Sequence, residues 1–447
     1  MRSSGIFEMD LQEIDMKKIA VIGAGILFLL GAVIFMPRDI SISASRTAAS
    51  VSEAVPQLVL PSVPEATSGQ PSDTPSTTTP PIVPAHTTTP SATPDVPAQQ
   101  LDTKPNRTEG FYMTAWIAGI PSRVDALIAK AKARGINTFI VDVKDYSGYV
   151  SYRMDIPEVI ASGADKQIRI AHPNDVLTKL HQNGMYAIAR VTVFQDPILA
   201  AAHPEWAMQD KETGRAWKDQ KGLSWMDPAA QPVWDYDIAI AKDAIARGFD
   251  EVNFDYVRFP SDGSLSRIAY PAWDGKEAKH AVLRRFFKYV SGQLPNAVIS
   301  ADVFGLVTVN SDDLGIGQVL EDTYGYFDYV SPMVYPSHYA KGFLGYKNPA
   351  EYPYEVIHYS MTKAVGKLYR FEQLQHSTTT PAEVPGPRAT KLRPWFQAFD
   401  LGADYTNDMI HKQMQAFSDV IRETSASQWD GGWLLWDPNN TYSNYAG

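Results

Sequence analysis

The chain contains no cysteine. Disulfide bonds, thiolate metal sites and cysteine nucleophiles are therefore all excluded. Stretches rich in Lys and Arg are also lacking, and the formal net charge of the 447 residues is -10 at pH 7. A nucleic-acid partner is disfavoured, because proteins that bind nucleic acids present basic surfaces to the phosphates.

Several catalytic motifs are missing as well. There is no HExxH zinc motif, no G-x-S-x-G serine elbow and no Walker loop, and the histidines are scattered. The first predicted strand, FYMTAWIAG at 111–119, has no His-x-His pair of the kind that metal-dependent barrel hydrolases commonly use. We therefore predict a site without a metal ion or a cofactor.

One long apolar run lies near the N-terminus. Ile19–Met36 is uncharged over 18 residues, close to the length that spans a bilayer as a helix. Because Lys17 and Lys18 precede it, the positive-inside rule places residues 1–18 in the cytoplasm and the rest of the chain outside. We favour a single-pass, uncleaved membrane anchor. The alternative is a signal peptide cleaved near the small residues 43–45, which would release a secreted protein.

Residues 37–108 have the composition of a disordered linker. Pro, Ser, Thr and Ala dominate, and 12 prolines fall between Val51 and Thr108. Such a sequence cannot bury a core and favours extended polyproline conformations. We predict a semi-rigid stalk that leads to one globular domain at 109–447, where all ten tryptophans lie.

Within this domain a helix repeatedly ends at a glycine and a strand follows at once. Ser122 and Asp125 resemble a capping box that opens the first helix. Gly135, Gly184 and Gly248 suit the left-handed position that ends the first three helices. The predicted helices cover 122–134, 174–183, 232–247 and 279–293.

Eight segments have the pattern of strands, and helix-length segments separate most of them. They cover 111–119, 136–145, 185–194, 250–259, 297–305, 327–336, 393–399 and 431–437. Alternating strands and helices indicate a parallel sheet. Eight such units in about 340 residues predict the α/β class and a (β/α)8 TIM barrel. A doubly wound sheet is the alternative, but the Gly-rich phosphate turn expected after its first strand is missing.

The alternation within EVNFDYVRFPSDG (251–263) predicts which side chains face the barrel lumen. The side of a strand that faces the helices must be apolar. This places Val252, Phe254 and Tyr256 against the helices, and Asn253, Asp255 and Val257 in the lumen.

The same test applies to the other strands. It turns Asp142 and Lys144 inward on the second strand, and it places Arg190 on the face of Ile188 and Thr192 on the third. On the fifth strand Asp302 shares a face with Ser300. On the eighth, Asp437 follows Trp436 at the strand's end.

Carboxylates in a lumen are costly unless they are hydrogen-bonded or paired. Near the C-terminal ends of the strands they mark the face where barrel enzymes carry their sites. Asp255 and Asp302, on the fourth and fifth strands, would lie within reach of one substrate. Glycoside hydrolysis requires such a pair, one group as acid and the other as nucleophile or base.

Each of these groups also has a purely structural interpretation. Asp142 could form an ion pair with Lys144 or Arg190. Asp255 and Asp302 could be satisfied by Arg190 or Arg258, and Asp437 could be an ordinary turn aspartate.

Aromatic side chains supply the second half of a sugar site, because their rings pack on the apolar faces of sugars. The candidates near predicted strand ends are Tyr146, Tyr149, Tyr256, Tyr335, Tyr339, Trp395, Trp433 and Trp436.

Five motifs in order carry a family resemblance: FDYVRFPSDG, SADVFG, DYVSPMVYPSHY, RPWFQAF and GGWLLWD. Together they resemble the bacterial family described as a "putative glycosyl hydrolase domain", over about residues 110–440. The resemblance implies a (β/α)8 barrel, secretion or membrane anchoring, and glycosidase activity.

Two better-understood groups are similar at a greater distance. On the chitinase-like pattern D-x-x-D-x-D-x-E, Val257 stands where the catalytic glutamate belongs, so the substrate-assisted mechanism lacks its acid. In amylase-like and α-galactosidase-like barrels the nucleophile is an aspartate at the end of the fourth strand, the place of Asp255. Their acid/base comes from the fifth or sixth strand, and Asp302 fits the fifth.

We therefore expect a membrane-anchored extracellular glycoside hydrolase of a poly- or oligosaccharide. Asp255 is the expected nucleophile or base, and Asp302 the general acid/base. Arg190 and Arg258 are expected to lower the pKa of Asp255. The expected sugar contacts are Asp142, Tyr335, Gln397, Trp436 and Asp437. The alternative is a non-catalytic carbohydrate-binding or wall-attachment protein on the same barrel.

Overall fold

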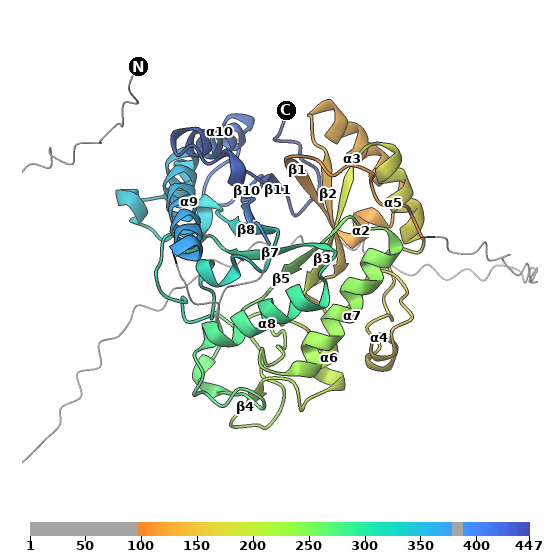
Figure 1. Cartoon of the computed structure of the whole chain (residues 1–447). Helices are drawn as coiled ribbons and strands as arrows, with labels where there is room; N and C mark the ends of the chain where they lie inside the picture. Colours follow the sequence, from red (N-terminus) through yellow and green to blue (C-terminus); the bar gives the residue numbers. More distant parts are fainter. Residues whose placement is uncertain (1–96, 378–387) are drawn as a thin grey trace, which may run out of the picture. The chain divides into compact units, whose positions relative to one another are not determined.

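The computed structural model describes residues 97–377 and 388–447 (Figure 1). The predicted membrane span at 19–36 and the stalk up to residue 96 lie outside the described residues. Among the described helices, none is both long and apolar enough to cross a membrane.

Eight parallel strands close into a barrel, which confirms the predicted barrel class. Their order around the ring is β1-β2-β3-β5-β7-β8-β10-β11. The pairing of β11 with β1 and of β10 with β8 closes it. The strands are β1 Thr108–Met113, β2 Thr138–Lys144, β3 Tyr186–Thr192, β5 Glu251–Asp255, β7 Val298–Phe304, β8 Tyr329–Met333, β10 Trp395–Gln397 and β11 Gly432–Trp436.

Helices surround the strands, and the last two long ones, α9 and α10, lie side by side (Figure 1). The short β9 (Lys391–Leu392) adds to β8, and β4 (Gln209–Asp210) pairs with β6 (Ile268–Ala269) in a separate antiparallel ribbon. The helices are α2 Ala115–Ala118, α3 Pro121–Ala133, α4 Pro157–Ser162, α5 Pro173–Gln182, α6 Pro197–Ala202, α7 Gln231–Arg247, α8 Lys279–Gln293, α9 Pro353–Ser377 and α10 Asn407–Glu423.

The predicted capping box of α3 is wrong. The helix begins at Pro121, and its N-cap, Ile120, makes no side-chain cap bond. Proline at the first helical position has a φ already suited to the helix and no N–H that needs a partner, so a capping side chain is dispensable there. The glycine that ends α7 does have its predicted role: Gly248 has φ 110°, and a Cβ there would meet the Ala98 carbonyl oxygen at 2.1 Å.

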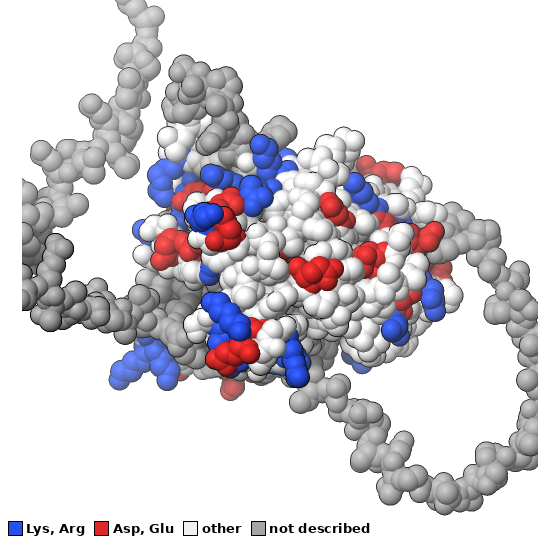
Figure 2. Space-filling model, turned by 90° about the horizontal axis from the view of Figure 1, so that it is seen from below, with Lys and Arg blue, Asp and Glu red and all other residues white. Residues whose placement is uncertain are grey.

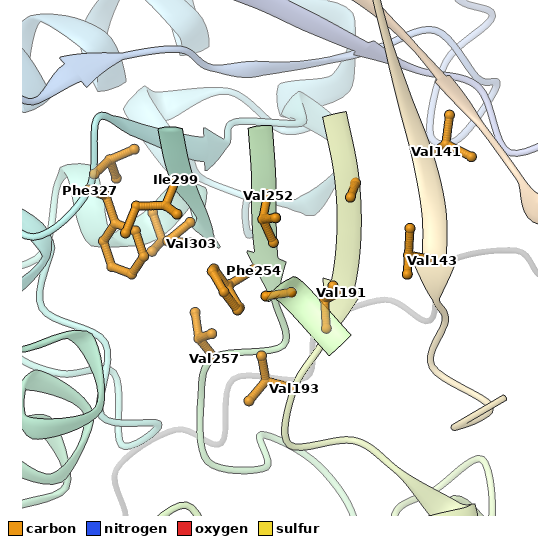
Figure 3. Close-up of a cluster of buried hydrophobic side chains, with 14 of the residues drawn as sticks. Val141, Val143, Val191, Val193, Val252, Phe254, Val257, Ile299, Val303 and Phe327 are labelled. Atoms are coloured by element: carbon orange, nitrogen blue, oxygen red, sulfur yellow. The ribbon is translucent and has the colours of Figure 1, made fainter. Parts of the chain in front are cut away.

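The barrel separates two apolar cores. The outer core lies between strands and helices and includes Val141, Val191, Val252, Phe254 and Ile299 (Figure 3). The inner core fills the lumen with Ile140, Tyr186, Ile188, Tyr335, Trp395, Phe399 and Leu434. The outward positions predicted for Val252 and Phe254 are therefore confirmed.

Lys144 does not share the lumen with Asp142. The register of β2 against β3 shifts between these two residues, so the alternation is broken by a β-bulge. Lys144 Nζ instead donates to Asp196 Oδ2 at 2.8 Å and to Asp237 Oδ1, on α7, at 2.6 Å. The predicted inward direction of Lys144 was wrong because a strict period of two does not survive a bulge.

The lumen contains an ion pair near the N-terminal ends of the strands, formed by Glu251 and Arg393. Glu251 and Arg393 are fully buried, and both guanidinium Nη atoms donate to the carboxylate. Ser300 Oγ donates to Glu251 Oε1 at 2.6 Å, and the Arg393 Cζ lies 4.1 Å from the centre of the Tyr329 ring. Glu251, Ser300 and Tyr329 lie on β5, β7 and β8, and Arg393 lies between β9 and β10. The ion pair therefore links several strands at the N-terminal end of the barrel.

The chain before β1 contacts this end of the barrel. The Ala98 N–H donates to the Arg247 carbonyl at 3.0 Å, and the Leu101 N–H donates to Asp250 Oδ1 at 2.8 Å. Lys104 Nζ lies 4.4 Å from the centre of the Tyr329 ring. Residues 98–104 therefore run along the strand starts, at the opposite end from the C-terminal strand ends.

Acidic and basic side chains are interspersed on the face of the molecule shown in Figure 2. Charges in such a setting are solvated, and exposed pairs contribute little to stability. The pair Lys412–Asp408 on α10 is an example, with side chains 50% and 71% exposed. The buried Glu251–Arg393 pair differs because neither group can turn to water if its partner is lost.

We predict that Glu251→Gln lowers the free energy of unfolding by about 3–5 kcal/mol, because it leaves the Arg393 charge buried without its counter-ion. Lys412→Gln, the matched change in an exposed pair, should cost less than about 1 kcal/mol. Chemical denaturation of the two variants beside the parent measures both values. Equal effects of the two substitutions would contradict the role given to the buried pair.

Candidate active site

A cavity of about 450 Å³ opens at the C-terminal ends of the strands. Its size falls in the range of sites for small molecules and short oligomers. The strands contribute Tyr112, Arg190, Asp255, Asp302, Trp395 and Trp436 to its wall. Phe304, the last residue of β7, also lines the cavity, and the segments after the strands contribute Trp225, Tyr256, Arg258, Tyr335 and His338.

Arg190 connects the acidic groups of two neighbouring strands. Its Nη1 donates to Asp142 Oδ1 at 2.7 Å, and its Nε and Nη2 donate to Asp255 Oδ2 at 3.1 and 2.5 Å. The register explains the contacts, because Asp142 pairs with Arg190 and Asp255 with Thr192 across the sheet. Burial alone would lower the pKa of Arg190, but the two carboxylates raise it well above its usual value.

Asp142 is positioned behind this arginine rather than in the cavity wall. Tyr112 Oη donates to Asp142 Oδ2 at 2.5 Å. Burial raises the pKa of the Asp142 carboxyl, and the nearby Arg190 charge opposes that rise. The ion pair of Asp142 with Arg190 is formed, and the alternative pair with Lys144 is not.

Asp255 is the last residue of β5, and the chain turns sharply after it. Tyr256 has φ 54°, an unusual conformation for a bulky side chain that concentrates at functional sites. Its N–H donates to Asp255 Oδ1 at 2.6 Å. Each oxygen of the Asp255 carboxylate therefore has a donor, and Asp255 is 6% exposed at the cavity.

The turn reverses the predicted directions of the next two residues. Tyr256 was expected to face the helices and Val257 the lumen. Instead Tyr256 lines the cavity, and Val257 packs in the outer core beside Phe254 and Val193 (Figure 3). Strand alternation ends where φ becomes positive, so the parity rule could not be carried beyond Asp255.

Asp302 lies on the neighbouring strand β7 and has a different environment. Its Oδ1 accepts from Asn253 Nδ2 at 2.9 Å and from Trp395 Nε1 at 2.8 Å, both neutral donors. The carboxyl is 1% exposed. Burial, followed by the charge of Asp255, raises its pKa to about 7. The inward positions predicted for Asn253, Asp255 and Asp302 are thus confirmed.

Aromatic rings line the cavity on two sides. Tyr335 and Trp436 have ring centres 5.3 Å apart, and Phe399 packs against both. On the other side the Trp225 and Tyr256 ring centres are 6.0 Å apart. Among the other aromatic candidates, Tyr339 and Trp395 line the cavity, whereas Trp433 packs in the outer core.

Arg258 lines the cavity but does not hold Asp255 as expected. Its Nη1 donates to the Phe259 carbonyl at 3.0 Å and to Ser261 Oγ at 3.3 Å. No carboxylate of the described residues lies in ion-pair contact with it, so Arg190 alone pairs with Asp255.

Two predicted sugar contacts lie outside the cavity wall. Gln397 is fully buried, and its side chain bonds to the Ser337 N–H and the Phe399 carbonyl. Asp437 accepts from Thr441 and Tyr442 N–H groups at 2.8 and 2.7 Å, which is the turn-aspartate alternative. Both residues shape loops next to the cavity, so neither reaches a substrate in it.

Trp225, Phe304 and His338 line the cavity and were not predicted. Trp225 lies in the connection between β3 and α7, residues 193–230. This connection contains α6 and β4 and is far longer than the usual βα loop of about 2–6 residues. The length of this connection is the feature of the sequence that could have pointed to Trp225, because long loops tend to be functional. His338 is held neutral at neutral pH, since burial lowers its pKa to about 4.

Residues 110–442 match the family described as "Putative glycosyl hydrolase domain". The chain belongs to this family. The match extends across the barrel strands, so the barrel as a whole is the glycosyl hydrolase domain. Membership gives the protein a glycoside hydrolase-like function and implies a carbohydrate substrate.

Solved structures similar to this glycosyl hydrolase domain include a hypothetical protein from Ruminiclostridium thermocellum. It is 35% identical, with 46% of this chain and 98% of that chain covered and a TM-score of 0.40. An α-galactosidase from Thermus thermophilus is 13% identical, with 76% and 60% covered and a TM-score of 0.43. The glycoside hydrolase domain of PelA from Pseudomonas aeruginosa is 12% identical, with 75% and 97% covered and a TM-score of 0.38. No curated protein sequence matches the chain.

We predict that Asp302→Asn stabilises the glycosyl hydrolase domain at pH 8 but not at pH 4. The folded protein holds the Asp302 proton up to about pH 7, whereas a free aspartate loses it near pH 3.8. Stability therefore falls as the pH rises through this window, and a neutral asparagine removes the loss. The pKa difference corresponds to a gain of up to about 4 kcal/mol.

Denaturant unfolding of parent and variant at the two pH values measures this gain. The same difference in stability at both would contradict a raised pKa of Asp302. Asp125→Asn, on an α3 side chain that is 60% exposed, serves as the control and should show no such trend.

Proposed function

We propose that the protein is a membrane-anchored extracellular glycoside hydrolase in which Asp255 and Asp302 act on one glycosidic bond. The observation that carries the proposal is the contrast between the two carboxyls in one cavity. Asp255 is in direct ion pair with Arg190. Asp302 accepts only from neutral donors and has a pKa of about 7.

This contrast supports a division of acid and base work. Asp302, whose raised pKa of about 7 lets it keep a proton that an ordinary aspartate has lost near neutral pH, gives that proton to the oxygen of the leaving sugar as the bond to the anomeric carbon breaks. The Asp255 carboxylate either attacks that carbon or takes a proton from the attacking water. In the first case water later releases the sugar from Asp255, and Asp302 accepts the proton of that water. The first sequence returns both groups to their starting states. After the second, Asp255 carries the proton taken from water and Asp302 has lost its own, so exchange of protons with solvent must restore them before the next turnover.

The remaining groups of the cavity position the reacting atoms. Arg190 fixes the Asp255 carboxylate and is itself held by Asp142, which makes Asp142 a positioning residue rather than a sugar contact. Tyr335 and Trp436 form an aromatic wall on which an apolar sugar face can pack. Gln397 and Asp437 act only through the loops that they hold.

We predict that Asp302→Asn lowers kcat/KM on a cleaved polysaccharide by about 10²–10⁴-fold, the usual contribution of a general acid. In the parent, kcat/KM should fall as the pH rises above about 7, because Asp302 loses its proton there. Asp255→Asn should abolish turnover as well. The measurement is release of reducing sugar from a panel of wall and storage polysaccharides, with Asp125→Asn as the control.

Full activity in either cavity variant would remove that residue from the mechanism. If the parent binds glycans without cleaving any of them, and binding survives Asp255→Asn, the protein is instead a carbohydrate-binding or wall-attachment protein. NMR of the first-formed product distinguishes the two mechanisms, because direct attack by Asp255 retains the anomeric configuration and attack by water inverts it.

The proposed location rests on the sequence before the barrel. Residues 19–36 would anchor the chain, and the stalk would hold the barrel outside the cell. The stalk ends before residue 98 rather than at 108, because residues 98–104 contact the barrel and Thr108 begins β1. We predict that the protein sediments with membranes and that protease added to intact cells removes the barrel. Deletion of 19–36 should abolish sedimentation. Protein in the growth medium would indicate signal cleavage, and protease-resistant protein in the cytosol would overturn the proposed location.

A further inference from the structure

Two arginines line the cavity, and their partners differ. Arg190 bonds two carboxylates, Asp142 and Asp255. Arg258 is only 7% exposed, yet none of the carboxylates in the described chain lies within ion-pair distance of it. The only acceptors of its described hydrogen bonds are the neutral oxygens of Phe259 and Ser261, and both bonds come from Nη1.

The Arg258 guanidinium is held between aromatic rings. Its Cζ lies 4.7 Å from the centre of the Trp225 ring, 4.8 Å from that of Phe304 and 5.5 Å from that of Tyr256. These contacts fix the plane of the group but accept none of its in-plane N–H donors. In the described part of the chain, Nε and Nη2 have no acceptor, and the side chain lines the cavity.

The acidic groups on this wall have other donors. Asp219 accepts from the side chains of Gln195 and Trp225 and from two backbone N–H groups. Asp262 Oδ1 accepts from the Gln220 N–H at 3.0 Å. Lys221, an exposed residue on the same wall, adds a second positive charge. The wall therefore presents a cation that no carboxylate of the described residues contacts directly, although the charges of Asp262, Asp255 and Asp219 raise its pKa from a distance.

A buried charge that no opposite charge contacts directly costs free energy, which carboxylates at a greater distance offset only in part. Burial lowers the pKa of Arg258, although an arginine stays protonated at all physiological pH values. The cost is recovered if a ligand brings the missing anion. Guanidinium groups suit this role, because two parallel N–H donors match two oxygens of a carboxylate or sulfate.

We propose that the cavity binds an acidic saccharide, and that Arg258 pairs through Nε and Nη2 with a carboxylate or sulfate on the sugar. The proposal rests on the proposed function for the choice of a saccharide. The requirement for an anion rests instead on the Arg258 guanidinium, because its Nε and Nη2 have no acceptor among the described residues. Because Arg258 follows Asp255 by three residues around the Tyr256 turn, it selects the sugar in the same cavity where the bond is cleaved.

The test is binding in the Asp302→Asn background, where turnover is suppressed. The probes are oligogalacturonates and hyaluronan oligosaccharides, each beside its carboxyl-reduced form, and a carrageenan oligosaccharide beside its desulfated form. Calorimetry should show at least one acidic probe binding about tenfold or more tightly than its neutral form. The carboxylate and sulfate pairs show which oxyanion the cavity takes.

Adding Arg258→Gln should remove this preference. Arg153→Gln is the matched control, because it removes the same charge from a side chain that is 82% exposed, and it should keep the preference. If Arg258→Gln fails to fold, the comparison of acidic and neutral probes on the Asp302→Asn protein still decides. Equal binding of both forms, no binding of any probe, or a preference that survives Arg258→Gln overturns the proposal.

Failure of this inference can be told apart from failure of the proposed hydrolase. Cleavage of neutral glycans alone, unchanged by Arg258→Gln, would leave the hydrolase and remove the acidic-sugar specificity. If an acidic probe binds through Arg258 but the parent never cleaves it, the acidic-sugar specificity would stand and the hydrolase would be removed.

Discussion

Arg190 is a buried cation at the point where strands β2, β3 and β5 present their last lumen side chains, and the site is organised around it. An arginine at this depth requires counter-charges, and the register supplies them from both neighbouring strands. Asp142 and Asp255 in turn would be costly to bury without the arginine. The three groups therefore form one unit, and Tyr112 connects it to β1 through Asp142.

The ionisable groups of the cavity behave differently because their partners differ, not because their residue types do. Asp255 and Asp302 are both aspartates on adjacent strands. One bonds a guanidinium and a backbone N–H, and the other bonds an amide and an indole. The same reasoning distinguishes Arg190 from Arg258. Burial disfavours every charge, so whether a group keeps its charge or requires a ligand depends on which neighbours offset that burial.

The turn at Tyr256 places the Asp255 carboxylate and the Arg258 guanidinium in the same cavity. A regular strand would have continued to alternate, which would have turned the Tyr256 ring toward the helices. The positive φ at Tyr256 ends the strand, gives the Asp255 carboxylate a backbone donor and returns Arg258 to the cavity wall. Strain of this kind costs free energy and persists only where the surrounding packing fixes it. Here Val257 is fully buried in the outer core next to the turn.

Much of the fold was readable from local patterns. Eight apolar strands, their separating helices and the helix-ending glycine Gly248 follow from periodicity and backbone chemistry that act over a few residues. Parity within regular strands correctly placed Asn253, Asp255 and Asp302 in the lumen for the same reason. The family motifs added the glycosyl hydrolase assignment.

Tertiary structure alone decided the rest. A bulge turned Lys144 outward, a positive φ exchanged the directions of Tyr256 and Val257, and loop bonding withdrew Gln397 and Asp437 from the cavity. Which arginine pairs with Asp255, and which is left unpaired, depends on distances between side chains far apart in the sequence. The sequence thus determines which residues a strand presents to the lumen, whereas partners and charges are set by three-dimensional contacts, because electrostatic and hydrogen-bond energies depend on separations of a few ångströms.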